Sequence, residues 1–392
     1  MRIIYAGTLI PHPGGSAVLG GDLVDGLARR GHDVVAIAPI TAAALAQGDP
    51  LAGGRFRVLR YLVPGFESSP NRPPSDRFRN EERDGVAGHL VPLLEAGGVD
   101  LVIAGRETFA THVPALAHRF AVPCVILVQG ATLWGLLDGA YSAGERRAIL
   151  DGVGAADRVI AVARHLVPHL EKLGLGRITA IPNAVNPSAF APGPRDPALM
   201  RAHDLRDADV IVAHVSNLKD LKRPLDVAQA AAAALRRDSR LRFLIVGDGP
   251  GRAQIETEAA RMGIDDRFRF SGWVPRAAVA SYLRLADVVV MPSAVEALAL
   301  VYLETQASGR VLTASDIAAA REVVEDGVTG LLFPMGDAEA MANCIVRAAA
   351  DPSLRAAIGA HARAFAEAHT FETALDAYER AFVQAVGGEP SE

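Results

Sequence analysis

Short runs of β-branched and aliphatic residues alternate with longer amphipathic stretches along the chain. The first run is RIIYAG at residues 2–7, and GDLVDGLARRG at 21–31 has the spacing of an amphipathic helix that Gly31 closes. Runs of this kind, separated by helices, are typical of a parallel sheet covered on both faces. Further strands are expected in the first half at residues 33–39, 99–105, 123–130, 158–163 and 178–183.

The pattern pauses near the middle of the chain. Residues 187–209 hold four prolines and little periodicity, which favours a linker and the entry to a second domain. The alternation then restarts, with strands expected at 210–216, 241–247, 267–272, 287–293, 310–315 and 330–334. We therefore predict an α/β chain of two Rossmann-like, doubly wound parallel-sheet domains facing a cleft: an acceptor-side domain at 1–188, a nucleotide-sugar domain at 189–370, and a C-terminal helix at 371–392 that crosses back to the first.

Composition and charge argue against a nucleic-acid-binding or membrane-spanning protein. The 392 residues carry a formal net charge of −5 and contain no basic run, which argues against a nucleic-acid partner. The sequence has neither a signal peptide nor about 18 uninterrupted apolar residues, so we expect a cytoplasmic protein without a transmembrane segment, with peripheral contact at the inner membrane face left open. Cys124 and Cys344 lie in apolar stretches and are expected to be buried thiols.

Three glycine-rich or basic loops follow predicted strands, where open α/β sheets bind their ligands. Gly14 and Gly15 precede a helix and would let the backbone approach an anion, although such a pair is also typical of a turn. The loop SNLKDLKRP carries three cations, which suit a diphosphate or simply a solvated loop: Lys219, Lys222 and Arg223. VGDGPG at 246–251 fits either a nucleotide-pocket wall or a turn.

The apolar segment PSAVEALALVYLETQASGR, residues 292–310, contains two carboxylates. Glu296 lies in the loop after a strand, and Glu304 lies on a helix expected from about Leu298 to Ser308. Eight residues correspond to about 80° of rotation, so both can border one site without facing the same atom. Carboxylates accept hydrogen bonds from sugar and ribose hydroxyls. A carboxylate without a hydrogen-bond partner is unfavourable among apolar neighbours.

These motifs resemble those of the retaining glycosyltransferases of family 4, which have the GT-B fold. The matching segments are PSAVEALALVYLE, ASG and REVVEDGVTGLLFP in the second half, PGGSAVLGGDLVDGLARRGHDV in the first, and the linker element IPNAVNPSAFAP. The second domain is similar to the branch that joins N-acetylglucosamine to malate, through HVSNLKDLKRPLDVAQA and IVGDGP. The first domain follows that branch less well.

The resemblance implies a role for each matching residue. Glu296 would bind hydroxyls of the transferred sugar, Lys222 the donor phosphate and Glu304 the ribose. The implied catalytic set is Glu296, Lys222 and Gln129. The implied donor-binding set is Gly15, Asn217, Lys219, Arg223, Gly247, Trp273, Val274, Leu298, Ala299, Leu300 and Glu304, with the Trp273–Val274 backbone meeting the base. The expected acceptor side is bordered by Gly14, Arg106, Glu107 and His112.

The sequence departs from the family pattern at four places. Gln129-Gly130 replaces the usual His-Gly, and glutamine can hydrogen-bond but cannot carry charge. Asn217 stands where most members have arginine. The remaining departures are Leu298-Ala299 in place of Phe-Gly, and Val311 in place of proline.

Two metal-like patterns are interpreted as structural. Asp207-Ala208-Asp209 is a DxD pattern that precedes a strand, and we expect it to be a solvated turn. His165 and His169 are four residues apart, but Pro168 lies between them and no HExxH glutamate is present, which favours two surface histidines.

We therefore predict a metal-independent, retaining glycosyltransferase that needs no cofactor, takes a nucleoside diphosphate sugar, expected to be a UDP-sugar, and uses a hydroxyl acceptor. A GT-B sugar-nucleotide epimerase and a non-catalytic nucleotide-sugar-binding protein are the alternatives. The segment SSPNRPPSDRFRNEERD, residues 68–84, is expected to be a loop that shapes the acceptor site. The sugar, the nucleotide, the acceptor, the pathway and the oligomeric state stay open.

Overall fold

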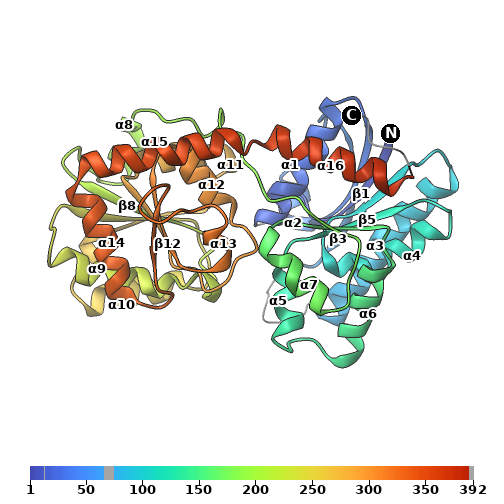
Figure 1. The fold of residues 1–392 in the computed structure, drawn as a ribbon, viewed down its shortest axis with the longest axis horizontal. Helices are drawn as coiled ribbons and strands as arrows, with labels where there is room; N and C mark the ends of the chain where they lie inside the picture. The colour runs from blue at the N-terminus through green and yellow to red at the C-terminus, as the bar shows by residue number, and fades with distance from the viewer. Residues whose placement is uncertain (13, 66–74, 388–392) are drawn as a thin grey trace. The chain divides into compact units, whose positions relative to one another are not determined.

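The computed structural model describes residues 1–12, 14–65 and 75–387, which form two compact units (Figure 1). Unit 1 comprises Met1–Asn183 and Glu372–Glu392, and unit 2 comprises Ala184–Phe371. The sequence placed the first division after residue 188, whereas the structure places it after Asn183. Residues 184–188 belong to unit 2 because Val185 forms a β-bridge with Thr370 and accepts a 2.9 Å hydrogen bond from Phe371 N.

Within its described residues, unit 1 has a seven-stranded sheet in the order β3-β2-β1-β4-β5-β6-β7, and every adjacent pair is parallel. The strands are β1 (Arg2–Ala6), β2 (Asp33–Thr41), β3 (Arg57–Val63), β4 (Leu101–Ala104), β5 (Cys124–Val128), β6 (Arg158–Ala161) and β7 (Ile178–Ala180). The sequence analysis did not anticipate β3, the edge strand. Figure 1 shows helices on both sides of the sheet: α1 (Gly15–Arg29), α2 (Ala42–Ala46), α3 (Asp76–Glu95), α4 (Val113–His118), α5 (Ala131–Leu137), α6 (Ala143–Ala155), α7 (Val167–Lys172) and α16 (Phe371–Ala385), with 3-10 turns η1 (Glu107–Thr111) and η2 (Arg164–Leu166).

Unit 2 repeats this plan with six strands among its residues, in the order β10-β9-β8-β11-β12-β13 and again parallel throughout. They are β8 (Val210–Val215), β9 (Leu241–Val246), β10 (Phe268–Gly272), β11 (Val288–Met291), β12 (Val311–Ser315) and β13 (Leu331–Phe333). The helices are α8 (Pro197–Ala202), α9 (Pro224–Leu235), α10 (Arg252–Arg261), α11 (Arg276–Leu285), α12 (Leu300–Ala307), α13 (Ala318–Arg321), α14 (Ala338–Ala350) and α15 (Pro352–Ala368), with 3-10 turns η3 (Asp220–Lys222) and η4 (Asp265–Arg267).

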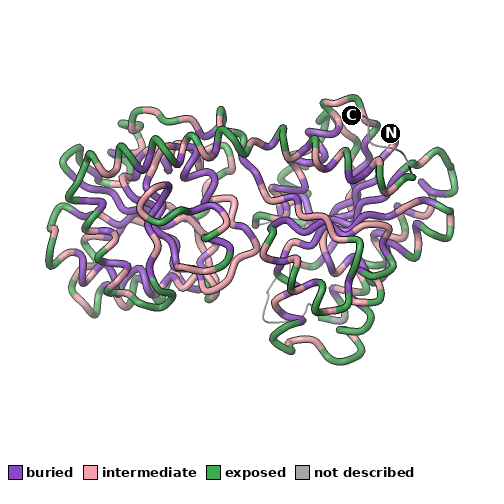
Figure 2. Tube along the Cα trace, in the orientation of Figure 1, coloured by how far each residue is buried: buried purple, intermediate pink, exposed green. Residues whose placement is uncertain are grey.

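The strands of both sheets are mostly buried on both faces, as Figure 2 shows along the middle of each unit. Continuous apolar strands are what a parallel sheet covered on both faces requires. Cys124 is buried in β5 and Cys344 is half-buried in α14, and among the described residues neither forms a disulfide. The two predicted doubly wound sheets are thus confirmed.

Two segments differ from the sequence-based expectation. Residues 68–74 of the predicted loop lie outside the described residues. Residues 76–84 of that segment are not a loop but the start of α3, which Ser75 caps, because its hydroxyl accepts a 3.3 Å hydrogen bond from Phe78 N. The proline-rich stretch at 187–209 contains the short helix α8, which Asp196 caps through Ala198 N and Leu199 N.

The Tyr5 ring lies in the core of unit 1 in a space that three glycines leave open. A Cβ atom added to Gly7, Gly20 or Gly105 would overlap the Tyr5 side chain. These glycines come from the end of β1, from α1 and from the end of β4, so one buried aromatic ring dictates small residues on three elements.

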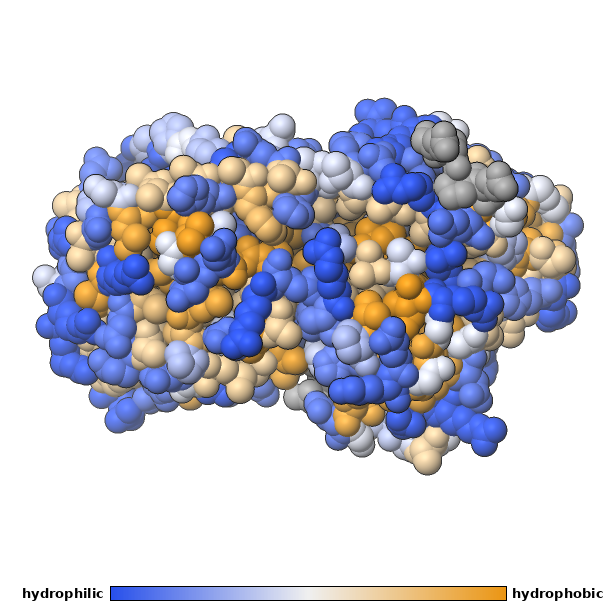
Figure 3. All heavy atoms as spheres, in the orientation of Figure 1, coloured by the Kyte–Doolittle hydropathy of each residue, from blue (hydrophilic) through white to orange (hydrophobic). Residues whose placement is uncertain are grey.

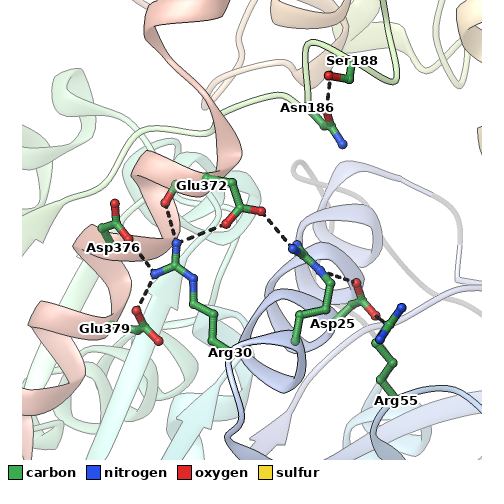
Figure 4. A network of polar contacts seen from close by, with 9 residues as sticks. Asp25, Arg30, Arg55, Asn186, Ser188, Glu372, Asp376 and Glu379 are labelled. Carbon is green, nitrogen blue, oxygen red and sulfur yellow. Dashed lines mark hydrogen bonds and ion pairs between the residues drawn. The ribbon is translucent and has the colours of Figure 1, made fainter.

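Helix α16 is tied to the end of α1 by a cluster of charges (Figure 4). The Arg30 guanidinium pairs with Glu372 at 3.1 Å, Asp376 at 2.6 Å and Glu379 at 2.5 Å. His32 Nε2 lies 2.8 Å from the other oxygen of Glu379. Four charged or titratable contacts therefore hold the C-terminal helix within unit 1.

No helix among the described residues is both long and apolar enough to cross a membrane. On the face drawn in Figure 3, hydrophobic and hydrophilic side chains are interspersed over both units.

Candidate functional site

Two residues singled out independently in the sequence meet in unit 2. Lys222, at the end of η3, forms an ion pair through Nζ with Glu296 Oε1, and the Ser293 hydroxyl donates to the same oxygen at 2.7 Å. Their loops follow β8 and β11, which are neighbouring parallel strands, and Ala294 N donates to Leu221 O at 2.8 Å. The side chains of Lys222 and Glu296 are 22% and 9% exposed, so the pair is largely enclosed but reachable.

A buried histidine fixes the loop that carries Lys222. His214 Nδ1 lies 2.9 Å from Val290 O and Nε2 lies 2.8 Å from Ser216 Oγ, which in turn accepts from Leu218 N at 3.1 Å. A carbonyl can only accept, so the proton is on Nδ1 and the Ser216 hydroxyl donates to Nε2. Burial, with Lys222 nearby, lowers the pKa of His214 to about 4, which keeps the ring neutral in this role.

The GDGPG loop packs directly against that loop. A Cβ at Gly247, Gly249 or Gly251 would overlap the carbonyl oxygen of Ser216, Asn217 or Leu218 respectively, and Gly247 and Gly249 also have positive φ. Glycine is therefore required for a close backbone approach as well as for a turn. Gly247 N further donates to Gly272 O at 3.0 Å, which brings the Trp273–Val274 segment beside this loop.

The other predicted donor-side residues of this loop have different surroundings. Arg223 has a left-handed φ of 47° and its guanidinium binds Asp226 at 2.6 and 3.1 Å, so it is engaged at the start of α9. Lys219 is half-buried, and burial together with Lys222 lowers its pKa. Asn217 Oδ1 is buried without a hydrogen-bond partner among the described residues, which leaves an unsatisfied acceptor in the same loop.

The second predicted carboxylate is also paired. Helix α12 begins at Leu300, two residues later than expected, with Ala299 as its N-cap and Leu298 buried before it. Glu304 is buried on α12 and forms an ion pair with Arg276, the first residue of α11. The sequence analysis missed Arg276. The available signal was a cation in a first helical turn, where the helix dipole disfavours positive charge.

The predicted acceptor-side residues of unit 1 are mostly engaged with protein. Arg106 forms an ion pair with Glu82 of α3, whose contribution the sequence did not reveal, and its guanidinium lies 5.2 Å from the Phe109 ring centre. Burial raises the pKa of Glu82, and Arg106 opposes this rise. The guanidinium of Arg106, which was expected to border the acceptor, is therefore engaged in a buried ion pair with Glu82.

The loops after β4 and β5 are hydrogen-bonded to each other. Glu107 Oε1 accepts from Gly130 N at 2.9 Å, and the Gln129 amide donates to Gly105 O at 3.0 Å. Burial raises the pKa of Glu107. The Gln129 side chain, which the sequence analysis expects where the family has histidine, is thus anchored by its nitrogen.

The remaining acceptor-side candidates differ in how much space surrounds them. His112 is buried, and that burial lowers its pKa to about 4. Gly14 has φ 113° and a Cβ there would meet nothing within 4 Å, so backbone conformation rather than space favours glycine. Gly15 is the first residue of α1, and Pro13 of this loop lies outside the described residues.

The two metal-like patterns have structural partners. Asp207 is exposed as expected, but Asp209 is buried and is not a solvated turn residue. The Asp209 carboxylate accepts a 2.8 Å hydrogen bond from Arg206 N and lies 3.7 Å from the Arg242 guanidinium. His165 and His169 are half-buried rather than on the open surface, with ring centres 6.3 and 5.3 Å from that of Trp134. No cluster of three metal-ligating side chains occurs in the part of the chain that the structure covers.

Comparison with known proteins identifies the family. The family model described as Glycosyltransferase Family 4 matches residues 13–189, and the one described as Glycosyl transferases group 1 matches residues 196–365. A protein of Actinosynnema mirum named D-inositol 3-phosphate glycosyltransferase is 34% identical over 385 residues, which cover 91% of this chain and 89% of that protein. The chain belongs to glycosyltransferase family 4.

Other relatives of this glycosyltransferase carry the same name. The Mycolicibacterium smegmatis protein is 32% identical over 91% of this chain and 83% of its own length. The match to the Kribbella flavida protein, 35% identical, spans 58% of each chain. This name differs from that of the malate-using branch that the second domain resembles in sequence.

Solved structures share the fold. Sucrose-phosphate synthase from Thermosynechococcus elongatus superposes with a TM-score of 0.82 at 21% identity, over 99% of the glycosyltransferase and all of that chain. HepE from Anabaena, in complex with UDP-glucose, gives a TM-score of 0.80 at 18% identity, over 98% and 100% of the two chains. The GT-B fold expected from the sequence is thus confirmed.

Proposed function

We propose that this glycosyltransferase transfers a sugar from a UDP-sugar to a hydroxyl acceptor, with retention of anomeric configuration and without a metal ion. The Lys222–Glu296 pair carries the proposal. It places a cation and a carboxylate together at the carboxyl edge of the second sheet. The donor needs both, because its diphosphate attracts the ammonium and its sugar hydroxyls donate to the carboxylate.

Cationic side chains would stabilise the leaving diphosphate. Lys222 and Lys219 are both held at the Ser216–Arg223 loop, and negative charge develops on the phosphate as the glycosidic bond breaks. A bound phosphate would also favour the charged form of Lys219, which burial disfavours in the ligand-free protein.

Glu296 acts as a binding carboxylate in this proposal. It already accepts hydrogen bonds from Lys222 and Ser293 through Oε1, which orients the group. The acceptor hydroxyl would give its proton to the leaving phosphate on the same face of the sugar, as the family resemblance implies. This route needs no enzyme nucleophile, and we assign none.

The choice of donor and acceptor is supported by similarity. HepE, a structural neighbour, binds UDP-glucose, and several relatives are named for D-inositol 3-phosphate. UDP-sugars are therefore the first donors to test and D-inositol 3-phosphate the first acceptor.

The test is product analysis with purified protein. UDP-glucose, UDP-N-acetylglucosamine and their GDP and ADP counterparts are each incubated with D-inositol 3-phosphate in EDTA, and the products are examined by mass spectrometry and NMR. We expect one UDP-sugar to give a glycoside with the donor's anomeric configuration. Inversion or a magnesium requirement would overturn those parts of the proposal. An altered sugar nucleotide without glycoside would indicate the epimerase, and tight binding without any product the non-catalytic protein.

A further inference from the structure

The turn that carries Lys222 has a strained backbone on both sides. Lys222 ends the 3-10 turn η3, which lies between two non-glycine residues with left-handed backbone, Leu218 with φ 45° and Arg223 with φ 47°. This conformation is unfavourable for a residue that has a Cβ atom, and it persists only where neighbouring groups hold it. The contacts of Leu218 therefore bear on how Lys222 is presented.

Leu218 is held through both of its backbone polar groups. Its N–H donates to the Ser216 hydroxyl at 3.1 Å, and its carbonyl accepts from Gly251 N at 2.9 Å. Leu218 is also fully buried, so it cannot turn outward without exposing an apolar side chain to water. The strained residue is thus fixed, and one of the two groups that fix it is a side-chain hydroxyl.

His214 orients that hydroxyl and links two strands of the sheet. The ring is fully buried in β8, where every other residue is apolar. Its Nδ1 donates to Val290 O of β11 at 2.9 Å, and its Nε2 accepts from the Ser216 hydroxyl at 2.8 Å. A buried imidazole is unfavourable among apolar residues unless its nitrogens are bonded, and both partners here lie on strands that lead into the candidate site. A directed relay therefore runs from β11 through His214 and Ser216 to Leu218.

The alternative is a histidine that only stabilises unit 2. A leucine at this position would suit the apolar strand β8, but the Ser216 hydroxyl would then lose its acceptor on the ring. The relay ends on Leu218, the strained residue from which the Lys222 turn starts. This end point favours a role in presenting Lys222.

We propose that His214 is a positioning residue that, through Ser216 and Leu218, holds Lys222 in place for the diphosphate of the donor. This inference rests on the proposed function. Lysine has a long side chain with high conformational freedom, so a fixed backbone reduces the ordering that phosphate binding must supply. His214 is fully buried and acts only through the loop. Its loss should therefore weaken binding of the phosphates and spare binding of the nucleoside.

The experiment measures Kd values of UDP and uridine by calorimetry in EDTA. The proteins are wild type, His214→Leu, Ser216→Ala, Ser216→Thr, Lys222→Met and the double variant His214→Leu/Lys222→Met. His203→Leu is the matched control, because the His203 ring lies 3.2 Å from the Tyr282 hydroxyl elsewhere in the same unit. Circular dichroism and Tm establish that each variant is folded. If His214→Leu is unstable, Ser216→Ala takes its place, alone and combined with Lys222→Met.

The expected pattern separates the phosphates from the nucleoside. His214→Leu, Ser216→Ala and Lys222→Met should each weaken UDP binding by about tenfold and leave uridine binding within about twofold of wild type. Ser216→Thr, which keeps the hydroxyl, should bind both ligands nearly as wild type does. The double variant should bind UDP no more weakly than Lys222→Met, because His214 acts through the lysine. His203→Leu should match wild type for both ligands.

Two outcomes would overturn the inference. Unchanged UDP affinity in His214→Leu, or in Ser216→Ala where that variant carries the test, would show that Lys222 is positioned without the relay. Equal weakening of UDP and uridine, or an additive loss in the double variant, would leave His214 a general stabiliser of unit 2. A different result identifies failure of the proposed function: if Lys222→Met binds UDP as tightly as wild type, or wild type binds no UDP, the donor-site assignment is wrong and the inference falls with it.

Discussion

Lys222 and Glu296 are 74 residues apart in the chain and form an ion pair at the carboxyl ends of the neighbouring strands β8 and β11. Each side chain satisfies the charge of the other while the protein is without ligand. A donor with a diphosphate and a hydroxylated sugar would offer each a further partner. We therefore propose that this pair links the fold to sugar transfer.

The buried histidines predict acid sensitivity. The pKa values of His214 and His112 are lowered to about 4 by burial, from an ordinary value of 6.5. Between these pH values the unfolded chain binds more protons than the folded protein, so the free energy of unfolding falls as pH falls from about 6.5 to 4. Each histidine contributes a slope of up to about 1.4 kcal/mol per pH unit.

Urea denaturation between pH 4 and 7.5 checks this prediction. His214→Gln should reduce the slope, and His361→Gln, which changes an exposed residue, should leave it unchanged. A slope in His214→Gln equal to that of wild type would show that this ring titrates normally in the folded protein.

The glycine cage around Tyr5 predicts opposite effects at adjacent positions of α1. A Cβ at Gly20 would overlap Tyr5 and approach Thr8 O, whereas a Cβ at Gly21 would meet nothing within 4 Å. Gly20→Ala should lower the free energy of unfolding by about 1–3 kcal/mol. Gly21→Ala should raise it by up to about 1 kcal/mol, because alanine favours a helix. Chemical denaturation of both variants gives the comparison, and equal effects would refute the cage.

Tyr5→Phe tests the same cage from its centre. The Tyr5 hydroxyl is buried without a hydrogen-bond partner among the described residues, and burial raises its pKa strongly. Losing that hydroxyl should therefore be neutral or slightly stabilising in denaturation. A large loss of stability would mean that the hydroxyl has a partner.

The contacts of Arg30 predict a salt-sensitive attachment of α16. Arg30→Gln removes three charge contacts and should lower stability, by an amount that shrinks as salt is raised because the carboxylates are partly exposed. Arg147→Gln, which breaks the exposed pair with Asp151 on α6, should have little effect. Thermal unfolding in low and high salt provides the measurement, and an equal loss in both variants would contradict it.

Most of the sheet architecture could be predicted because its strands are continuous apolar runs. Strand β3 could not, since Arg57 and Arg60 interrupt its pattern. The structure shows that Arg60 is buried against Asp49 at 2.8 Å, which makes an arginine acceptable in this edge strand. The start of α3 was missed for a related reason, as the prolines before Ser75 dominated the local pattern.

In the candidate site, too, some features could be predicted from the sequence and others could not. Glu296, Glu304 and Lys222 could be identified from loop position and residue type. The ion pairs of Arg276 with Glu304 and of Arg106 with Glu82 could not be predicted as contacts, because they depend on how helices pack. The sequence marked Arg276 only as a cation in a first helical turn. The glycines of the GDGPG loop matched a turn, and only the structure shows which carbonyl oxygens they must approach.

The most direct test of the account is to measure transfer and binding in Glu296→Gln, with the donor that the product assay identifies. Glu339→Gln, an exposed glutamate in the same unit, is the control. We predict that Glu296→Gln loses about 100-fold or more in kcat/KM and binds the UDP-sugar more weakly, yet binds UDP as wild type does, because Lys222 remains. Near-wild-type transfer in Glu296→Gln would contradict the assignment of the Lys222–Glu296 pair as the centre of the donor site.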